Sequence, residues 1–201
     1  MSKIAYILVA GGPCSGKTTL VNALSNELSK RGLRVYVIRD WARELIRKNR
    51  GVGEPLPWTN RVEFEVKVVK EHLKDYRRAL RQSLDVIVED SGPISAIAYC
   101  RVDKVELPSE VLRKIIEHTR NIDIVILTHM NAGMYSKDSE RWESKDYALR
   151  IHKEIINIHK ELLHNKVYLV SHSMRPELRL KDVIDYVIKY LKRKGLITGN
   201  Q

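Results

Sequence analysis

Short apolar runs recur along the chain and are separated by longer stretches in which apolar residues return every three or four positions. Thr18–Lys30, for example, has leucines at helical spacing and predicts a helix. Short runs separated by helices are typical of parallel strands covered on both faces. The pattern predicts an α/β fold, a five-stranded parallel sheet with helices on both sides, and ligands at the carboxyl edge. The strand candidates are Ile4–Ala10, Val35–Ile38, Val86–Val88, Ile122–Leu127 and Val167–Val170.

Two longer connections interrupt this alternation. Segment 49–60 contains glycines and prolines and leads into a long helix expected over about Arg61–Gln82. Segment 131–145 is polar, precedes a helix expected over about Asp146–His164, and is a candidate lid. With 201 residues, 43% of them hydrophobic, the chain predicts one domain over 1–194 and a flexible tail over 195–201.

A glycine-rich sequence joins the first apolar run to the first predicted helix. Its glycines let successive backbone N–H groups turn toward one point, and the helix start adds partial positive charge there. We expect Lys17 to reach the β- and γ-phosphates of a nucleoside triphosphate, Thr18 to be an oxygen ligand of Mg²⁺, and Thr19 to extend the site. The sequence has the phosphate-loop pattern G-x-x-x-x-G-K-[ST] and reads Gly11, Gly12, Pro13, Cys14, Ser15, Gly16, Lys17, Thr18.

An acidic residue and an arginine follow the second apolar run. Asp40 stands at the expected sheet edge, and Arg43 lies one helical turn beyond it. In phosphoryl transfer, such a carboxylate accepts the proton of an acceptor hydroxyl, while the arginine holds the acceptor or the transferred group. The alternative for Asp40 is a plain helix N-cap.

The third apolar run ends in two carboxylates, Glu89 and Asp90. A carboxylate that ends a strand beside a phosphate loop orients Mg²⁺ or its water, and we assign this role to Asp90. Strand alternation would point Glu89 to the other face. Capping of the helix around Ser95–Tyr99 by Asp90 or Ser91 is compatible with this role.

Further candidates lie in the two loops that follow the fourth and fifth runs. Arg141, in the candidate lid, is the arginine expected to neutralise charge on the γ-phosphoryl group. Arg175 either stacks on the nucleotide base or belongs to an ordinary surface loop. His152 and His159 are two helical turns apart, too far to share a metal ion, and are expected to be solvated or packed.

Three residues near the second connection border a conceivable acceptor pocket. Trp58 or Phe64 would stack on a planar group, with Arg61 between them. Their spacing fits a helix start packed against the core better, and we favour that interpretation.

Composition narrows the class of protein. The net charge of +11 favours polyanionic partners, yet much of the basic excess lies on predicted helices, where a solvated face is ordinary. A nucleic-acid partner is therefore not favoured. The two cysteines are far apart in the sequence and form neither a disulfide pattern nor a zinc motif. No apolar run approaches the roughly 20 residues of a membrane span, so we expect a cytoplasmic protein without a membrane partner.

The phosphate loop, the segment from Asp40 to Glu44, the segment from Asp90 to Pro93 and the region 138–150 together resemble P-loop small-molecule kinases. More narrowly, the chain is similar to the AAA-domain ATPase/kinase group related to ribosylnicotinamide kinases, and more distantly to nucleoside and nucleotide kinases. This resemblance implies strand order 2-3-1-4-5, ATP with Mg²⁺, and an acceptor hydroxyl facing Asp40. Relatives more often carry Glu at that position, and they tend to have Arg where this chain has Ser91.

Three functions follow from these features. The leading one is a Mg²⁺-dependent kinase that transfers the γ-phosphoryl group of ATP to a hydroxyl of a small nucleoside-like metabolite. The Asp40–Arg43 pair also resembles polynucleotide 5′-hydroxyl kinases, although no basic strip interleaved with aromatic residues is evident. A nucleotide-dependent regulatory ATPase would use the same loop without an acceptor. A dedicated GTPase is disfavoured because the fourth run continues into Thr128–Asn131 without an N-K-x-D guanine reader.

Overall fold

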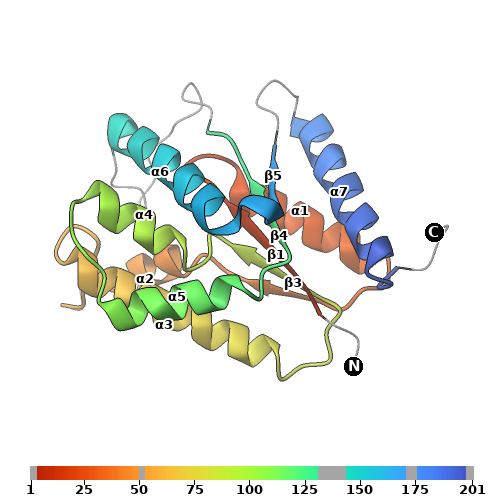
Figure 1. Ribbon diagram of the computed structural model, residues 1–201, viewed down its shortest axis with the longest axis horizontal. Helices are drawn as coiled ribbons and strands as arrows, with labels where there is room; N and C mark the ends of the chain where they lie inside the picture. Colours follow the sequence, from red (N-terminus) through yellow and green to blue (C-terminus); the bar gives the residue numbers. More distant parts are fainter. Residues whose placement is uncertain (1–3, 50–52, 131–143, 171–175, 198–201) are drawn as a thin grey trace.

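The computed structural model describes residues 4–49, 53–130, 144–170 and 176–197 as an α/β protein (Figure 1). Hydrogen bonds from side chains fix several helix starts: Asn60 accepts from the Glu63 N–H, and Ser144 accepts from the Tyr147 N–H. A 3₁₀ turn over His164–Lys166 leads into the last strand. The strands are β1 Ala5–Ala10, β2 Val35–Ile38, β3 Val86–Asp90, β4 Ile124–Leu127 and β5 Val167–Leu169. The helices are α1 Lys17–Lys30, α2 Trp41–Asn49, α3 Arg61–Ala79, α4 Ser95–Val102, α5 Ser109–Thr119, α6 Lys145–Leu163 and α7 Pro176–Arg193.

The five strands form one parallel sheet in the order β2-β3-β1-β4-β5. This confirms the predicted fold class and strand order. The register pairs Val9 of β1 with Asp90 of β3, and Ala10 with Leu127 of β4. The carboxyl ends of β1, β3 and β4 therefore lie together, and the phosphate loop starts at this edge.

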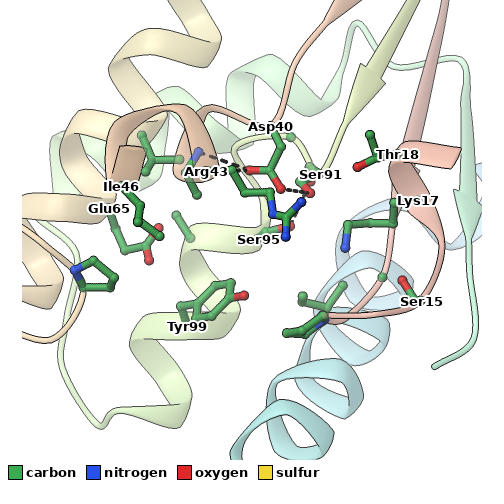
Figure 2. A pocket seen from close by; sticks show the side chains of 18 of the residues that line it. Ser15, Lys17, Thr18, Asp40, Arg43, Ile46, Glu65, Ser91, Ser95 and Tyr99 are labelled. Carbon is green, nitrogen blue, oxygen red and sulfur yellow. Dashed lines mark hydrogen bonds between the residues drawn. The ribbon is translucent and has the colours of Figure 1, made fainter. Parts of the chain in front are cut away.

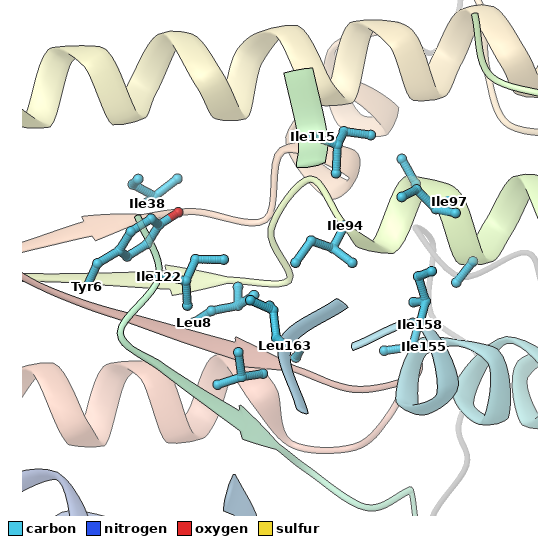
Figure 3. Close-up of a cluster of buried hydrophobic side chains, with 14 of the residues drawn as sticks. Tyr6, Leu8, Ile38, Ile94, Ile97, Ile115, Ile122, Ile155, Ile158 and Leu163 are labelled. Atoms are coloured by element: carbon cyan, nitrogen blue, oxygen red, sulfur yellow. The ribbon is translucent and has the colours of Figure 1, made fainter. Parts of the chain in front are cut away.

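Alternate residues of β1 face two separate apolar cores. Ala5, Ile7 and Val9 pack against α1 and α7, whereas Tyr6 and Leu8 pack on the other face against side chains of α3 to α6. Figure 3 shows part of this second core, in which Ile155 and Ile158 of α6 approach Ile94 and Ile97 from the α4 region. Burial on both faces explains why β1 is apolar throughout and gives no alternating pattern.

Some boundaries differ from those predicted. Helix α3 ends at Ala79 rather than near Gln82, because the next N–H groups make tight i to i−3 bonds, including Gln82 N–H to the Ala79 carbonyl. Strand β4 begins at Ile124 rather than Ile122, since the Asp123 carboxylate instead accepts the Tyr6 N–H. Of the tail expected over 195–201, Leu196 and Ile197 pack against the α1–α7 core, and 198–201 lie outside the described residues.

No helix within the described ranges is both long enough and apolar enough to cross a membrane.

Candidate active site

The loop between β1 and α1 has the backbone shape expected of a phosphate cradle. Gly16, directly before α1, has φ of +80°, and Cys14 also lies in the left-handed region with φ of +56°. Left-handed residues in such a loop turn neighbouring N–H groups inward. The Lys17 ammonium donates to the Gly12 carbonyl at 2.9 Å, and the Ser15 hydroxyl donates to the same oxygen at 2.8 Å. The Lys17 side chain is thus held against the backbone of the loop itself.

Gly12 is required because another helix comes close to it. A Cβ placed on Gly12 would lie 2.5 Å from Cβ of His152 on α6, closer than real side chains approach. The Gly12 N–H donates to His152 Nδ1 at 3.0 Å, and the Met130 N–H approaches Nε2 of the same ring at 3.3 Å. Only one nitrogen of a neutral imidazole can accept, and the shorter contact assigns that role to Nδ1, so His152 ties the loop to α6. His152 and His159 are both buried, which matches the packed alternative for these residues.

The predicted metal pair lies together at the start of α1. The Thr18 hydroxyl donates to Asp90 Oδ2 at 2.6 Å, so two hard oxygen donors are adjacent. Burial raises the pKa of Asp90, and repulsion from Asp40 raises it further, while Lys17 and the Thr18 hydroxyl act in the opposite direction. A divalent cation would relieve both unfavourable effects.

Thr18 and Asp90 offer the few protein oxygens that Mg²⁺ uses, and not the full set of protein ligands that some other metal ions require. The described residues contain no group of three or more His, Cys, Asp or Glu side chains that could hold a metal ion. Mg²⁺ keeps several waters and takes only one or two protein oxygens beside those of a phosphate. Thr18 and Asp90 fit that requirement.

Asp40 caps α2, as the alternative considered for it predicted, and its second carboxylate oxygen faces Ser91. Its Oδ1 accepts the N–H groups of Ala42 and Arg43 at 3.1 and 3.3 Å, which caps α2. Its Oδ2 accepts from the Ser91 hydroxyl at 3.3 Å, and the same hydroxyl lies 3.4 Å from Asp90 Oδ1. Ser91 thus bridges the two carboxylates, and its φ of +73° sets the turn that places it there.

One cavity of about 270 Å³ connects the phosphate loop with these groups (Figure 2). Asp40 and Arg43 line it together with Lys17, and Figure 2 shows the Arg43 side chain extending into it beside Asp40 and Ser91. Gly12 is absent from the lining, because its N–H group is bonded to His152. The other predicted phosphate contacts all line the cavity: Pro13, Cys14, Ser15, Gly16, Lys17, Thr18 and Thr19.

The far end of the cavity contains a buried ion pair, of which only Arg61 was among the residues considered from the sequence. Arg61 and Glu65 of α3 lie there, only 8% and 2% exposed, with Arg61 Nη1 2.9 Å from Glu65 Oε1. Tyr99 and Ser95 of α4 also line the cavity, and the Ser95 hydroxyl donates to the Ser91 carbonyl at 2.8 Å. Figure 2 places Glu65 and Ile46 across the cavity from Lys17 and Ser15.

Of the three residues considered for an acceptor pocket, two line the cavity and one does not. Arg61 and Phe64 line the cavity, and Phe64 also packs in a small buried cluster with Ile46 and Val68. Trp58 is 43% exposed and is not among the lining residues. Arg141, Arg175 and most of the candidate lid lie outside the described residues.

Glu89 points away from the site, as strand alternation predicted. It is buried on the opposite face of the sheet, with His72 Nδ1 2.7 Å from its Oε1 and the Tyr6 hydroxyl bonded to its Oε2. Burial alone would raise the pKa of Glu89, but bonding to His118 and His72 outweighs it and lowers the pKa to about 2. Glu89 is a structural charge directly behind the metal pair.

Comparisons with known proteins agree with this geometry. The model of a family described as an AAA domain matches residues 6–175. A crystal structure of NadR protein in complex with NAD and AMP-PNP has a TM-score of 0.66 to this chain, with 17% sequence identity. That match covers 99% of this chain and 52% of NadR, so the chain spans about half the length of that protein. At this identity the likeness shows the fold alone, and a search of curated protein sequences finds no match. The family match over most of the chain, together with the phosphate loop and the strand order, shows that the chain belongs to the AAA-domain family of the P-loop NTPase and kinase group.

Proposed function

We propose that the protein is an ATP-dependent kinase that phosphorylates a hydroxyl of a small, nucleoside-like molecule. One observation carries the proposal: Asp40, a half-buried carboxylate, lines the same cavity as Lys17 and Thr18. A carboxylate at this place can accept the proton of an acceptor hydroxyl. A similar fold binds AMP-PNP in NadR, which supports ATP as the donor.

The residues divide the work of phosphoryl transfer. The loop N–H groups and Lys17 hold the triphosphate, with Lys17 leaving the Gly12 carbonyl to reach the β- and γ-phosphates. Thr18 and Asp90 would hold Mg²⁺, which when bound neutralises phosphate charge. The oxygen of the acceptor hydroxyl forms a bond to the γ-phosphorus, and the bond between the γ-phosphorus and ADP breaks. Asp40 Oδ2 accepts the proton that the hydroxyl loses. Arg43 stabilises the transferred group or the acceptor from the same side.

The cap made by Asp40 also serves this chemistry. Because Oδ1 is bonded to the α2 backbone, the carboxylate has a fixed orientation and presents Oδ2 to the cavity. A base held in this way needs little reorganisation before reaction. The cap and the base are therefore two uses of one side chain.

The direct test is acceptor-stimulated release of ADP from Mg·ATP. Nucleosides, ribosylnicotinamide, nucleotides and 5′-hydroxyl oligonucleotides serve as acceptors, with wild type, Lys17→Ala and Asp40→Asn compared. Asparagine caps helices as well as aspartate but is not a base, so Asp40→Asn separates the two roles. Stimulation by a small acceptor that is lost in both variants is the expected result. Stimulation by oligonucleotides alone would assign a polynucleotide kinase, and slow hydrolysis indifferent to every acceptor and to Asp40→Asn would assign a regulatory ATPase.

A further inference from the structure

Buried charges are concentrated at the end of the cavity remote from the phosphate loop. Arg61 Nε is 2.7 Å from Asp103 Oδ2, and its Nη2 donates to the Tyr147 hydroxyl at 3.1 Å. The Tyr147 hydroxyl in turn donates to Asp103 Oδ1 at 2.7 Å, and the Arg61 guanidinium covers the Tyr99 ring at 5.0 Å. Arg61 is therefore held by groups from three other parts of the chain: α4, the turn after α4, and α6.

Glu65 is bonded through only one of its oxygens. Its Oε1 receives Arg61 Nη1, whereas Oε2 receives no hydrogen bond from any residue that the structure describes. A carboxylate oxygen that faces a cavity and receives no hydrogen bond from the protein can accept one from a bound molecule. Because Glu65 lines the cavity, that oxygen is available to a bound molecule.

The charge balance at this end is negative or zero. Arg61 contributes one positive charge, and Asp103 and Glu65 are its two carboxylate partners. Burial raises the pKa of Glu65 to about 7, with Arg61 opposing the effect. The cluster therefore carries about one negative charge when Glu65 is ionised and none when it is protonated, and it offers no unmatched positive charge to an anion.

We propose, on the basis of the proposed kinase function, that Glu65 selects the acceptor, which is a neutral or cationic molecule presenting an N–H or O–H donor to Glu65 Oε2. An acceptor that already carries a phosphate or carboxylate at this end is rejected. The shape of the site agrees with this assignment. The whole cavity of about 270 Å³ is near the lower limit for small-molecule sites, and apolar side chains of Ile46, Phe64 and Val68 surround the charged pair. An acceptor with a mainly apolar body and one polar edge suits this lining.

Direct binding tests the selection separately from catalysis. With AMP-PNP present, calorimetry measures the affinity of uridine as the neutral probe, ribosylnicotinamide as the cationic probe and uridine 5′-monophosphate as the anionic probe. Wild type is expected to bind a neutral or cationic probe at least about tenfold more tightly than the anionic one. Tightest binding of the anionic probe, or no binding of any of the three, would overturn the assignment.

Substitutions of Glu65 provide a second test of the proposal. Glu65→Gln should lower the affinity for the preferred probe by about tenfold or more and leave the affinity for AMP-PNP unchanged. Glu65→Asp keeps the charge and should retain the preference among probes at lower affinity. Glu71→Gln is the matched control, because it makes the same change on the same helix at a residue that does not line the cavity. Equal affinities in Glu65→Gln and Glu71→Gln would contradict the proposal.

The pH dependence separates a direct contact from a structural role. Glu65 is faced by Arg61 and, at longer range, by Asp103 and Asp40, with His72 lining the cavity further along α3. Affinity for a cationic probe should rise as pH increases through about 7 in wild type and should stay flat in Glu65→Gln. If wild type binds a probe selectively but transfers no phosphoryl group to it, the kinase function fails and the selection by Glu65 stands.

Discussion

The two ends of the cavity are built in different ways. The phosphate end is one continuous loop, and its chemistry comes from backbone N–H groups, Lys17 and Thr18. The inner end is assembled from side chains of α2, α3 and α4, with a buried ion pair at its centre. The first arrangement suits a ligand part shared by all nucleoside triphosphates, and the second suits a part that distinguishes one acceptor from another. On the proposed function, recognition of the triphosphate and recognition of the acceptor would be separated along one cavity.

The largest expected effect is at the phosphate end. Lys17→Ala should lower acceptor-dependent ADP release by roughly 10³-fold or more, because it removes the mobile cation at the γ-phosphate. Lys30→Ala, at the other end of α1, controls for loss of a positive charge from the same helix. Steady-state kinetics with Mg·ATP measures both, and similar rates for the two variants would remove Lys17 from the mechanism.

Asp40 stands between the two ends, and its replacement should affect transfer without affecting nucleotide binding. Asp40→Asn is expected to lower the acceptor-dependent rate by about 10²- to 10⁴-fold, since the base is lost and the helix cap is kept. Glu44→Gln, on the same helix and paired with Arg47 but not lining the cavity, should have no such effect. Unchanged transfer in Asp40→Asn, measured together with ATP affinity, would show that Asp40 only caps the helix.

The face of β3 behind the site is expected to affect stability rather than turnover. Glu89→Gln should lower the free energy of unfolding by roughly 3 kcal/mol near neutral pH, because a buried charge network loses its centre. Glu161→Gln, which removes an exposed partner of Arg101, should cost under about 1 kcal/mol. Denaturant unfolding gives both values, and equal losses would show that the buried network is not stabilising.

The same residue sets an expected acid sensitivity. The pKa of Glu89 in the folded protein is about 2, below its ordinary value of 4.5. Its stabilising contribution is therefore present above about pH 4.5 and is lost as the pH falls from there toward 2. Unfolding free energies measured over this range should fall more steeply with acid in wild type than in Glu89→Gln. Parallel curves would contradict the assignment.

The smallest expected effects come from two glycines that are needed for different reasons, Gly12 for the close approach of a helix and Gly32 for its left-handed backbone. Gly12→Ala should cost about 1–3 kcal/mol of stability and weaken ATP binding, because the new methyl group meets His152. At Gly32 φ is +81°, and an added Cβ would meet no atom within 4 Å. Gly32→Ala should therefore lower the free energy of unfolding by about 1 kcal/mol without changing ATP binding. Thermal melts and nucleotide titrations compare them, and intact ATP affinity in Gly12→Ala would mean that the loop shifts away from α6 without loss.

The sequence predicted the fold and the phosphate end well, because both depend on local patterns. Apolar runs marked the buried strands, and the loop motif lies within eight consecutive residues. The inner end depends on which helix faces the cavity, and that is a tertiary property. The sequence did contain a sign of the inner end. Arg61, Glu65 and His72 fall on one face of α3 together with Val68. Polar residues on a buried helix face indicate that the face borders something other than an apolar core. Nothing local indicated that Ser91 bridges Asp40 and Asp90, because the contact needs the left-handed turn after β3.

The most direct test of the central claim, that one cavity holds both the triphosphate and the acceptor hydroxyl, is the fate of the γ-phosphoryl group. ATP labelled in that group is incubated with Mg²⁺, the best acceptor from the panel, and either wild type or Asp40→Asn. We predict that wild type places the label in a phosphate ester of the acceptor, and that Asp40→Asn leaves nearly all of it in ATP. Label found only in inorganic phosphate, at the same rate in both proteins, would contradict the account.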